Sequence, residues 1–216
     1  YDQLIIQAAT DARKNSIGWM TRIKPLQAKN GNIILPLYSD GFNLSIMAIS
    51  NDLGKTWTPS SPVVSRGGIQ PALIERKNGE LLALMRDNGD EPGHIKMSSS
   101  QNGGSDWTPA EKTTIPNPGS SVEMLKLQDG RLILVCNDLS EGRYKLSLYA
   151  STDEGKTWQY SGWIEHDILK KDGFSYPAAI QDSDGLIHIT YSKHAAEKGK
   201  TIQHVIINPD RISTSR

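Results

Sequence analysis

One eight-residue phrase occurs three times along the chain, and it constrains the fold more than any other feature of the sequence. The copies are SNDLGKTW, SQNGGSDW and STDEGKTW, and they begin at Ser50, Ser100 and Ser151. The period is therefore about fifty residues, a length typical of proteins built from similar units that stack beside one another. A jelly roll or an immunoglobulin-like sandwich does not repeat in this way.

A second phrase occurs four times, out of phase with the first. Its copies are KNGNIILPLY, KNGELLALMR, QDGRLILVCN and SDGLIHITYS, with glycines at Gly31, Gly79, Gly130 and Gly185. An Asn-Gly or Asp-Gly pair followed by β-prone apolar residues predicts a tight hairpin turn between two strands. The segment QLIIQAATDARKN has apolar spacing too short and mixed to predict a helix. The sequence therefore predicts an all-β protein.

The repeat length and the strand signals together predict a β-propeller. Each blade of a propeller is a sheet of about four short strands, and a blade takes roughly 40 to 55 residues. Blade-like repeats fall near residues 20–66, 67–115, 116–165 and 172–208. We therefore expect residues 1–216 to form a single, partial β-propeller domain with about four blades.

A phrase present in several blades cannot be the unique catalytic site of an enzyme with one site, so we interpret the first phrase as structural. Its Asp can accept hydrogen bonds from nearby backbone N–H groups, and its Gly can adopt a positive φ. Its tryptophans, Trp57, Trp107 and Trp158, are expected to pack between sheets. A calcium loop is the alternative, but one or two carboxylates per copy supply few of the oxygens that calcium takes.

The charge balance and hydropathy argue against several classes of partner. The chain has 24 Lys and Arg residues against 24 Asp and Glu residues, so no net field favours nucleic acid or an anionic membrane. No apolar run approaches the length of a membrane span. We expect no cofactor and no metal, because His188 and His204 lack the spacing of a metal site and are expected to pack within or at the edge of strands.

Cysteine content and targeting signals say little about the compartment. Cys136 is the only cysteine and lies in the apolar run LILVC, which predicts a buried structural thiol and excludes an internal disulfide. No signal peptide is visible, and we expect that the N-terminus is processed or truncated. The glycosylation triplet at Asn43 is weak evidence of secretion. The location stays open.

The repeated phrase resembles the Asp-box of the sialidase (neuraminidase) superfamily. The blocks IQPALIERKNGELLALMRDNG, PNPGSSVEMLKLQDGRLILVCNDLSEGRYKLSLYASTDEGKTW and FSYPAAIQDSDGLIHITYS are similar to its branch of BNR repeats. The resemblance covers nearly the whole chain. It implies a six-bladed β-propeller of sialidase type, of which this chain supplies about four blades, the rest coming from the parent chain. It also favours a secreted or periplasmic location.

Equivalent positions in successive blades indicate which residues face a common pocket. Nine residues before each turn glycine stand Arg22, Gln70, Ser121 and Tyr176, all of them polar. The resemblance implies that Tyr176 is the catalytic nucleophile. A neutral phenol suits a sugar whose carboxylate sits at the anomeric carbon, since that carboxylate repels a carboxylate nucleophile. A tyrosine that only packs in a strand is the alternative.

Arginine is the residue best suited to grip the carboxylate of such a sugar, because its planar fork donates two parallel hydrogen bonds. The resemblance implies that Arg86 and Arg143 are the second and third members of the superfamily's arginine triad. Snorkelling surface arginines are the alternative. Arg22 shares the blade position of Tyr176 and is expected to contact ligand. The first triad arginine and the acid/base aspartate belong to a blade that this chain lacks.

One residue departs from the superfamily's pattern. Gln70 stands where the resemblance implies a glutamate that activates the nucleophile, and an amide cannot take the proton of a phenol whose ordinary pKa is about 10. Glu123 is the candidate substitute, or else a surface carboxylate. Asp138 is expected either to line the rim of the pocket or to cap a turn.

Two functions fit these residues. The first is an exo-acting glycoside hydrolase of sialidase type, which cleaves a terminal acidic sugar with Tyr176 as nucleophile and arginines as carboxylate ligands. The second is a propeller that binds an acidic glycan without catalysis, or with different catalytic groups, and Gln70 favours it. Either way the expected partner is a glycan or acidic sugar.

Overall fold

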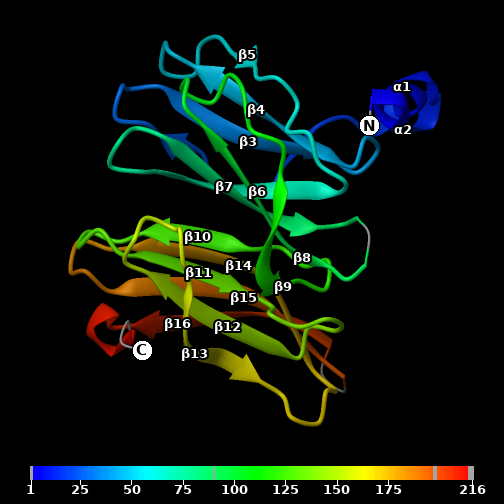
Figure 1. Cartoon of the computed structure of the whole chain (residues 1–216). Helices are drawn as coiled ribbons and strands as arrows, with labels where there is room; N and C mark the ends of the chain where they lie inside the picture. Colours follow the sequence, from blue (N-terminus) through cyan, green and yellow to red (C-terminus); the bar gives the residue numbers. More distant parts are fainter. Residues whose placement is uncertain (1, 90, 197–198, 214–216) are drawn as a thin grey trace. The chain divides into compact units, whose positions relative to one another are not determined.

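The regular structure is almost entirely antiparallel β-sheet. The computed structural model describes residues 2–89, 91–196 and 199–213. The chain forms two compact units, unit 1 of residues 1–114 and unit 2 of residues 115–216, and each is considered by itself. Four sheets account for all the paired strands (Figure 1), which confirms the predicted all-β class. Within the described ranges, no helix has the length and apolar character needed to cross a membrane.

Two short helices precede the first strand, α1 (Asp2–Thr10) and α2 (Ala12–Ile17). The irregular apolar spacing predicts no helix here, and that prediction is wrong. Local capping explains α2, because the Asp11 carboxylate accepts a hydrogen bond from the backbone N–H of Arg13 at 2.9 Å. Gly18 ends the helix with a φ of 72°. Caps of this kind define a short helix without an amphipathic repeat.

Unit 1 contains two sheets. The first comprises β1 (Met20–Thr21), β2 (Leu26–Gln27), β3 (Ile33–Ser39), β4 (Leu44–Ser50) and β5 (Thr58–Pro59). Its order is β1-β3-β4-β5, and β2 pairs with another part of β3. The second comprises β6 (Gly68–Glu75), β7 (Leu81–Asp87), β8 (His94–Ser100) and β9 (Glu111–Pro116), in that order.

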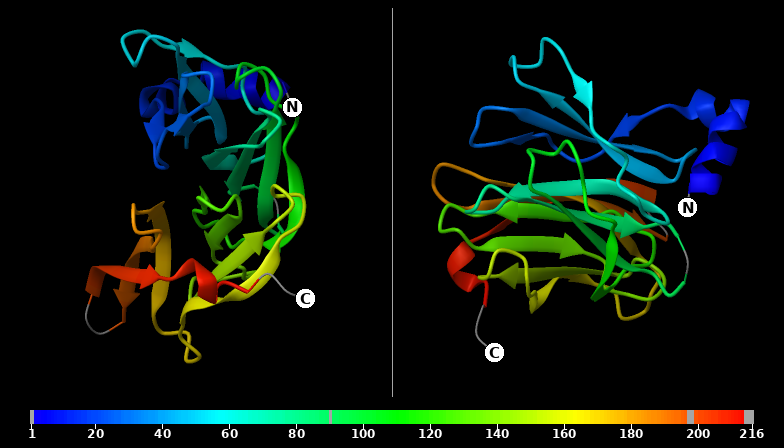
Figure 2. Two further views of the ribbon diagram at one scale, coloured as in Figure 1. Left: turned by 90° about the vertical axis from the view of Figure 1, so that its left-hand side faces the viewer. Right: turned by 45° about the horizontal axis from the view of Figure 1, so that its top comes forward.

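Unit 2 also contains two sheets. The first comprises β10 (Glu123–Lys126), β11 (Leu132–Cys136), β12 (Lys145–Ser151) and β13 (Gln159–His166). The second comprises β14 (Gly173–Gln181), β15 (Ile187–Ala195) and β16 (Gly199–Ile207), followed by a short 3-10 helix, η1 (Pro209–Arg211). In both sheets each strand pairs with the next strand of the chain, as the ribbons of Figure 2 show.

The four repeated glycines form tight turns between neighbouring strands. Gly31, Gly79, Gly130 and Gly185 have φ values of 88°, 86°, 90° and 83°. This left-handed region favours glycine, because any side chain there is strained. The hairpin turns predicted from the second phrase are therefore confirmed.

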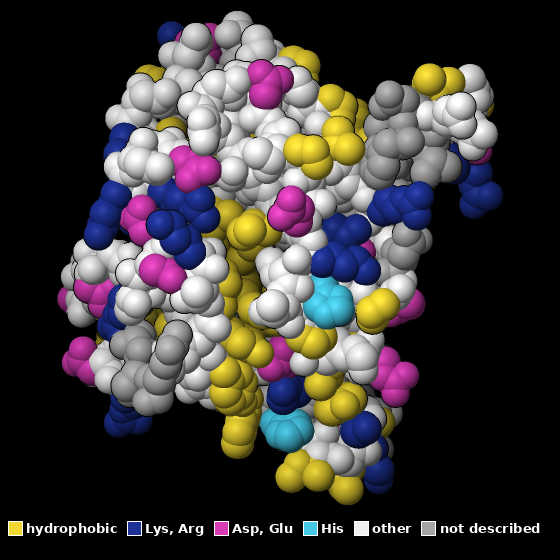
Figure 3. Space-filling model, in the orientation of Figure 1, with side chains coloured by type: hydrophobic (Ala, Val, Ile, Leu, Met, Phe, Trp, Pro, Cys, Tyr) yellow, Lys and Arg dark blue, Asp and Glu magenta, His cyan; other side chains and the backbone are white. Residues whose placement is uncertain are grey.

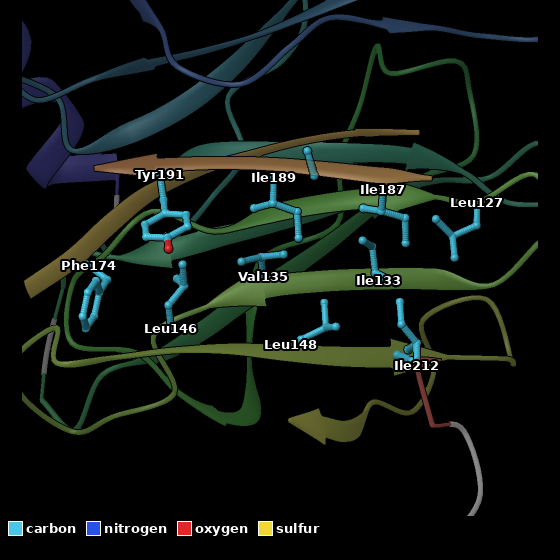
Figure 4. Packing of buried hydrophobic residues seen from close by; sticks show 12 residues of the cluster. Leu127, Ile133, Val135, Leu146, Leu148, Phe174, Ile187, Ile189, Tyr191 and Ile212 are labelled. Atoms are coloured by element: carbon cyan, nitrogen blue, oxygen red, sulfur yellow. The ribbon is translucent and has the colours of Figure 1, made fainter. Parts of the chain in front are cut away.

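Each unit has a core built from alternate residues of its strands. In unit 2, Val135, Leu148 and Ile189 lie on three strands of two sheets and meet in one cluster (Figure 4). The cluster comprises Leu127, Ile133, Val135, Leu146, Leu148, Ala150, Phe174, Ala179, Ile187, Ile189, Tyr191 and Ile212. The corresponding cluster of unit 1 comprises Ala28, Ile34, Met47, Val63, Leu73, Leu81, Ala83, Met85 and Trp107. Spacing of two along a strand places these side chains on one face.

The first and third Asp-boxes are closed by the same hydrogen bonds. The Asp52 carboxylate accepts from the Ser50 hydroxyl at 2.8 Å, and from the backbone N–H and hydroxyl of Thr56 at 2.9 and 2.6 Å. Gly54 N–H donates to the Ser50 hydroxyl at 2.8 Å. The third copy repeats these bonds around Asp153. The bonds from Thr56 lower the pKa of Asp52 to about 2.

The second Asp-box reverses one donor and one acceptor. Asn102 replaces the aspartate and Asp106 replaces the threonine, and the Asn102 amide donates to the Asp106 carboxylate at 2.8 Å. The Asn102 carbonyl oxygen still accepts from the Asp106 N–H at 2.9 Å and from the Ser100 hydroxyl at 3.0 Å. The loop therefore keeps its hydrogen bonds, although the donor and the acceptor of one side-chain bond have changed places. This supports the structural interpretation of the phrase.

The box tryptophans differ from one another. Trp107 is buried in the core of unit 1, and its indole N–H donates to Gly104 O at 2.8 Å. Trp57 makes the same bond to Gly54 O at 3.0 Å, but 41% of its surface is exposed. The prediction that the tryptophans pack between sheets therefore holds for Trp107 and is wrong for Trp57.

Candidate functional site

The residues singled out in the sequence gather at one end of their sheets. In each sheet the first strand begins where the second strand finishes, since the register pairs Gly68 with Asp87 and Glu123 with Val135. We call this the mouth end. The opposite end, which carries the hairpin turns and the Asp-boxes, is the box end. The mouth-end candidates are Arg22, Gln70, Arg86, Glu123, Asp138, Arg143 and Tyr176.

Gln70 and Tyr176 share an unusual backbone. Their φ values are 56° and 55°, and each is followed by a proline, Pro71 or Pro177. A bulge interrupts the strand pairing at both places. A side chain in this region is strained by about 1–3 kcal/mol, and such strain is concentrated at functional sites. The other two equivalent residues, Arg22 and Ser121, are not among the described residues with positive φ.

Tyr176 lies beside Arg143 in unit 2. The guanidinium carbon is 5.7 Å from the centroid of the phenol ring, and 40% of the tyrosine surface is exposed. This distance is within the range of a cation–π contact. The two residues that the sequence assigned to nucleophilic attack and carboxylate binding are therefore neighbours.

The backbone around Arg143 is tied to the strand that carries the tyrosine. The Arg143 carbonyl accepts a hydrogen bond from the Phe174 N–H at 2.7 Å. Its guanidinium donates to Gly119 O at 3.0 Å, so one nitrogen is already occupied. A guanidinium has five N–H donors, which leaves others for a ligand.

Glu123 and Ser121 lie where the first strand of unit 2 begins. Glu123 is 2% exposed and pairs with Val135 across the sheet, so the surface alternative for this carboxylate is wrong. Ser120 and Ser121 are fully buried, and neither hydroxyl has a hydrogen-bond partner among the described residues. The turn before them is fixed, because Asn117 Oδ1 accepts from the Ser120 N–H at 3.0 Å.

Asp138 is the centre of a cluster whose other three side chains all lie on β12. Its carboxylate accepts hydrogen bonds from Ser147 at 2.7 Å and Tyr149 at 2.9 Å, and it pairs with Lys145 at 2.9 Å. Burial, followed by the Asp138 charge, raises the pKa of Tyr149. These contacts commit Asp138 to its own sheet, and they are neither of the two roles expected from the sequence.

Asn137 is a mouth-end residue that the sequence analysis did not select. Its amide nitrogen donates to Lys145 O at 2.7 Å and to Phe174 O at 3.0 Å, so it links the two sheets of unit 2 two residues before Tyr176. Its position directly after the buried run LILVC was the available signal. The run itself ends in Cys136, whose pKa burial raises well above the ordinary value, as expected for a structural thiol.

In unit 1, Arg86 lies across the sheet from Ile69, next to the bulge that holds Gln70. The neighbouring Asp87 is 4% exposed, and its carboxylate lies 3.2 Å from Lys96 Nζ and accepts from the Gly89 N–H at 2.9 Å. This carboxylate therefore has a basic partner of its own.

Buried polar atoms without a described hydrogen-bond partner are concentrated at the mouth ends. In unit 1 they include Gln70 Oε1 and Arg86 Nε, and in unit 2 the side-chain oxygens of Ser120, Ser121 and Asn137. Such atoms are rare in folded proteins, and each calls for an explanation, such as an unmet ligand or water. Trp158 Nε1 is the corresponding atom at a box end. The mouth ends are thus the best-supported location for a binding site.

Two histidines that were expected to pack separately lie together at the box end of unit 2. His188 Nδ1 is 3.0 Å from His204 Nε2, and His188 Nε2 is 2.8 Å from the Asp182 carboxylate. The bond to His188 lowers the pKa of Asp182. No group of three or more His, Cys, Asp or Glu side chains among the described residues has metal-site geometry.

Two hollows lie in unit 1 away from the mouth end. One of about 670 Å³ is lined by box-end residues that include Asn30, Asn78 and Asn102. Asn78 Oδ1 and Asn30 Oδ1 accept bonds from their own turns at 3.1 and 3.0 Å.

On the face drawn in Figure 3, acidic and basic side chains are interspersed rather than gathered into one patch, in line with the zero net charge.

A comparison with protein families shows to which family the chain belongs. The model described as the BNR repeat-like domain matches residues 8–189, which is most of the chain. The chain belongs to the BNR repeat-like domain family. This agrees with the resemblance seen in the Asp-boxes. A comparison with curated protein sequences gave no significant match.

Solved structures similar to this BNR repeat-like chain include a trans-sialidase, a sialidase and an arabinanase. The intramolecular trans-sialidase from Ruminococcus gnavus matches 89% of this chain with 21% identity and a TM-score of 0.70. The NanB sialidase from Streptococcus pneumoniae matches 88% with 18% identity and a TM-score of 0.71. The alpha-L-arabinanase from Penicillium chrysogenum matches 87% with 20% identity and a TM-score of 0.66.

The chain spans less than half of both sialidases, 44% of the first and 31% of the second. At these identities the likeness establishes the fold. The four sheets of the BNR repeat-like chain therefore have the fold of β-propeller blades of sialidase type, as predicted.

Proposed function

We propose that the protein is a glycoside hydrolase of sialidase type that removes a terminal acidic sugar from a glycan. The observation that carries the proposal is the neighbouring pair of Tyr176 and Arg143. A partly exposed phenol supplies a neutral nucleophile, and the guanidinium beside it supplies a ligand for a carboxylate. The strained backbone at Tyr176 adds support, because strain of this kind is concentrated at functional sites.

In the proposed reaction Arg143 binds the sugar carboxylate. The Tyr176 oxygen attacks the anomeric carbon as the bond to the leaving-group oxygen breaks. The phenol proton passes to a carboxylate, which we assign to Glu123, and the leaving oxygen takes up a proton from solvent. Water then attacks the anomeric carbon, the bond to the Tyr176 oxygen breaks, the attacking water gives up one proton to solvent, and Glu123 returns its proton to Tyr176.

Turnover of a fluorogenic sialoside by the full-length protein tests this proposal. Tyr176→Phe is expected to lower kcat/KM by at least about a hundredfold, because the nucleophile is removed. Tyr160→Phe is the matched control, since Tyr160 is 43% exposed and also lies on a strand of unit 2. Equal activity of the wild type and Tyr176→Phe would contradict the proposal.

A second candidate is a propeller that binds an acidic glycan without cleaving it. Gln70 favours this candidate, because its amide cannot accept a proton from a phenol. Gln70→Glu distinguishes the two. A rise in sialoside turnover in this variant supports the hydrolase, whereas binding of the acidic sugar without turnover in any variant supports the binding protein.

A further inference from the structure

The Gln70 amide is an unmet hydrogen-bond acceptor inside unit 1. The side chain is 4% exposed, and its Oε1 atom receives no hydrogen bond from any described residue. A buried acceptor left without a donor is unfavourable, so positions of this kind are usually filled by a ligand group or a water molecule. Gln70 therefore points to a ligand that brings a donor.

The backbone fixes the position of this amide. Gln70 has a φ of 56° in a bulge, and Pro71 follows it. The same arrangement holds Tyr176 in unit 2, where φ is 55° and Pro177 follows. A strained conformation used at equivalent positions of two blades indicates that both side chains are held in a set direction.

Arg86 supplies a cation on β7, the strand that pairs with the strand of Gln70. It faces Ile69 across the sheet, and Ile69 directly precedes Gln70. One guanidinium nitrogen donates to Asn88 at 3.3 Å, while the buried Nε has no described hydrogen-bond partner. Lys96 pairs with the adjacent Asp87 at 3.2 Å, and Arg86 itself has no ion-pair partner among the described residues.

A bare anion satisfies only one of these two groups. Carboxylate and sulfate oxygens accept hydrogen bonds from Arg86 but, when ionised, have no proton to donate to Gln70. A sugar acid with a free hydroxyl close to its carboxylate satisfies both. In hexuronates and in sialic acids, the 4-hydroxyl is the non-anomeric ring hydroxyl nearest to the carbon that bears the carboxylate.

We propose that Gln70 is a specificity-determining residue whose Oε1 accepts a hydrogen bond from the 4-hydroxyl of a sugar acid, while Arg86 binds the carboxylate of the same sugar. This inference rests on the proposed function, since it takes the ligand to be an acidic sugar. It adds that the 4-position must be free.

Calorimetric affinities of the full-length protein test the inference with two pairs of probes. The first pair is D-glucuronate and its 4-O-methyl ether, and the second is N-acetylneuraminate and its 4-O-methyl ether. The wild type is expected to bind the free hydroxyl at least about fivefold more tightly within at least one pair, because methylation removes the donor. Gln70→Met is expected to abolish this preference, and Gln70→Glu, which keeps an acceptor, to retain it.

Gln27→Met is the matched control, because it makes the same chemical change at an exposed position of unit 1. It is expected to leave the preference unchanged. The inference is overturned if the wild type binds both members of each pair equally, or if Gln70→Met keeps the preference. Should Gln70→Met fail to fold, Gln70→Glu decides, since loss of the preference there also overturns it.

Failure of the proposed function gives a different result. In that case the wild type binds none of the four probes, or binds them with an affinity that Arg86→Met and Arg143→Met do not change, and both proposals fall. If binding depends on the arginines but not on Gln70, the inference alone falls.

Discussion

The two ends of each blade repeat for opposite reasons. At the box end, Asp52 and Asp153 close the same loop with the same bonds, and the altered second copy keeps those bonds by exchanging donor and acceptor. At the mouth end, the equivalent residues differ from blade to blade, and several keep buried polar atoms without described partners. Repetition with the same loop hydrogen bonds indicates structure, whereas repetition of position with changing chemistry indicates a binding site.

The largest contrast is expected from one substitution made at both ends of unit 2. Arg143→Lys at the mouth end should lower the affinity for an acidic sugar by roughly tenfold or more, because lysine lacks the planar fork. Arg131→Lys at the box end should leave affinity unchanged and lower stability instead, since Arg131 donates to two backbone carbonyls there. Titration calorimetry measures the affinity and urea unfolding measures the stability. Similar losses of affinity in both variants would contradict the assignment of binding to the mouth end alone.

The strain at Tyr176 is expected to have the next largest effect. Because its φ is 55°, Tyr176→Gly should be more stable to unfolding than Tyr176→Ala by about 1 kcal/mol. At Tyr160, which is not among the positive-φ residues described, the order should reverse, since glycine weakens a regular strand. Urea unfolding of the four variants checks this. If the Gly and Ala variants have the same order of stability at both sites, the backbone at Tyr176 is not strained.

The box ends should make stability depend on acid. Burial raises the pKa of Asp153, but hydrogen bonds from Thr157 and Ser151 outweigh burial and lower the pKa to about 2. A folded pKa below the ordinary value of 3.8 means that this contribution is complete above about pH 4 and is lost as the pH falls toward 2. Asp153→Asn should therefore flatten the fall in stability between these pH values. Urea midpoints that fall equally in both proteins would contradict this.

The smallest effect is expected from restoring the consensus in the second Asp-box. Asn102→Asp alone places a carboxylate against Asp106 and should lower the Tm by roughly a few degrees. The double substitution of Asn102→Asp with Asp106→Thr should recover most of that loss, because the Thr hydroxyl then donates to the carboxylate. Calorimetric scans of single and double variants measure the coupling, and simple additivity would show that the exchange is not compensatory.

The sequence predicts features that depend on short-range chemistry. Gly79 and Gly185 reveal the hairpins because only glycine suits the turn, and the fixed offset from them finds Gln70 and Tyr176. The bulges at these residues are not visible in the sequence, because they depend on register with a neighbouring strand. The partners of Asp138 were missed for a similar reason, since Ser147 lies on the next strand.

Helices α1 and α2 show the reverse case. The sequence contains the capping residues of α2, but the prediction relied on apolar periodicity instead. Asp11 and Gly18 bracket α2 as caps, yet apolar periodicity alone excluded a helix. The roles of Glu123 and Arg22 stay predictions, because sequence offset fixes where a residue stands in a blade but not what it binds.

The order in which the strands pair has a consequence for how the protein is made. In three of the four sheets, each strand pairs with the strand synthesised just before it. A sheet with such local contacts can form as soon as its last strand leaves the ribosome, without waiting for distant sequence. Nascent chains are thus expected to mature sheet by sheet, and a translational pause that comes once β13 (Gln159–His166) has left the ribosome would find β10 to β13 already paired.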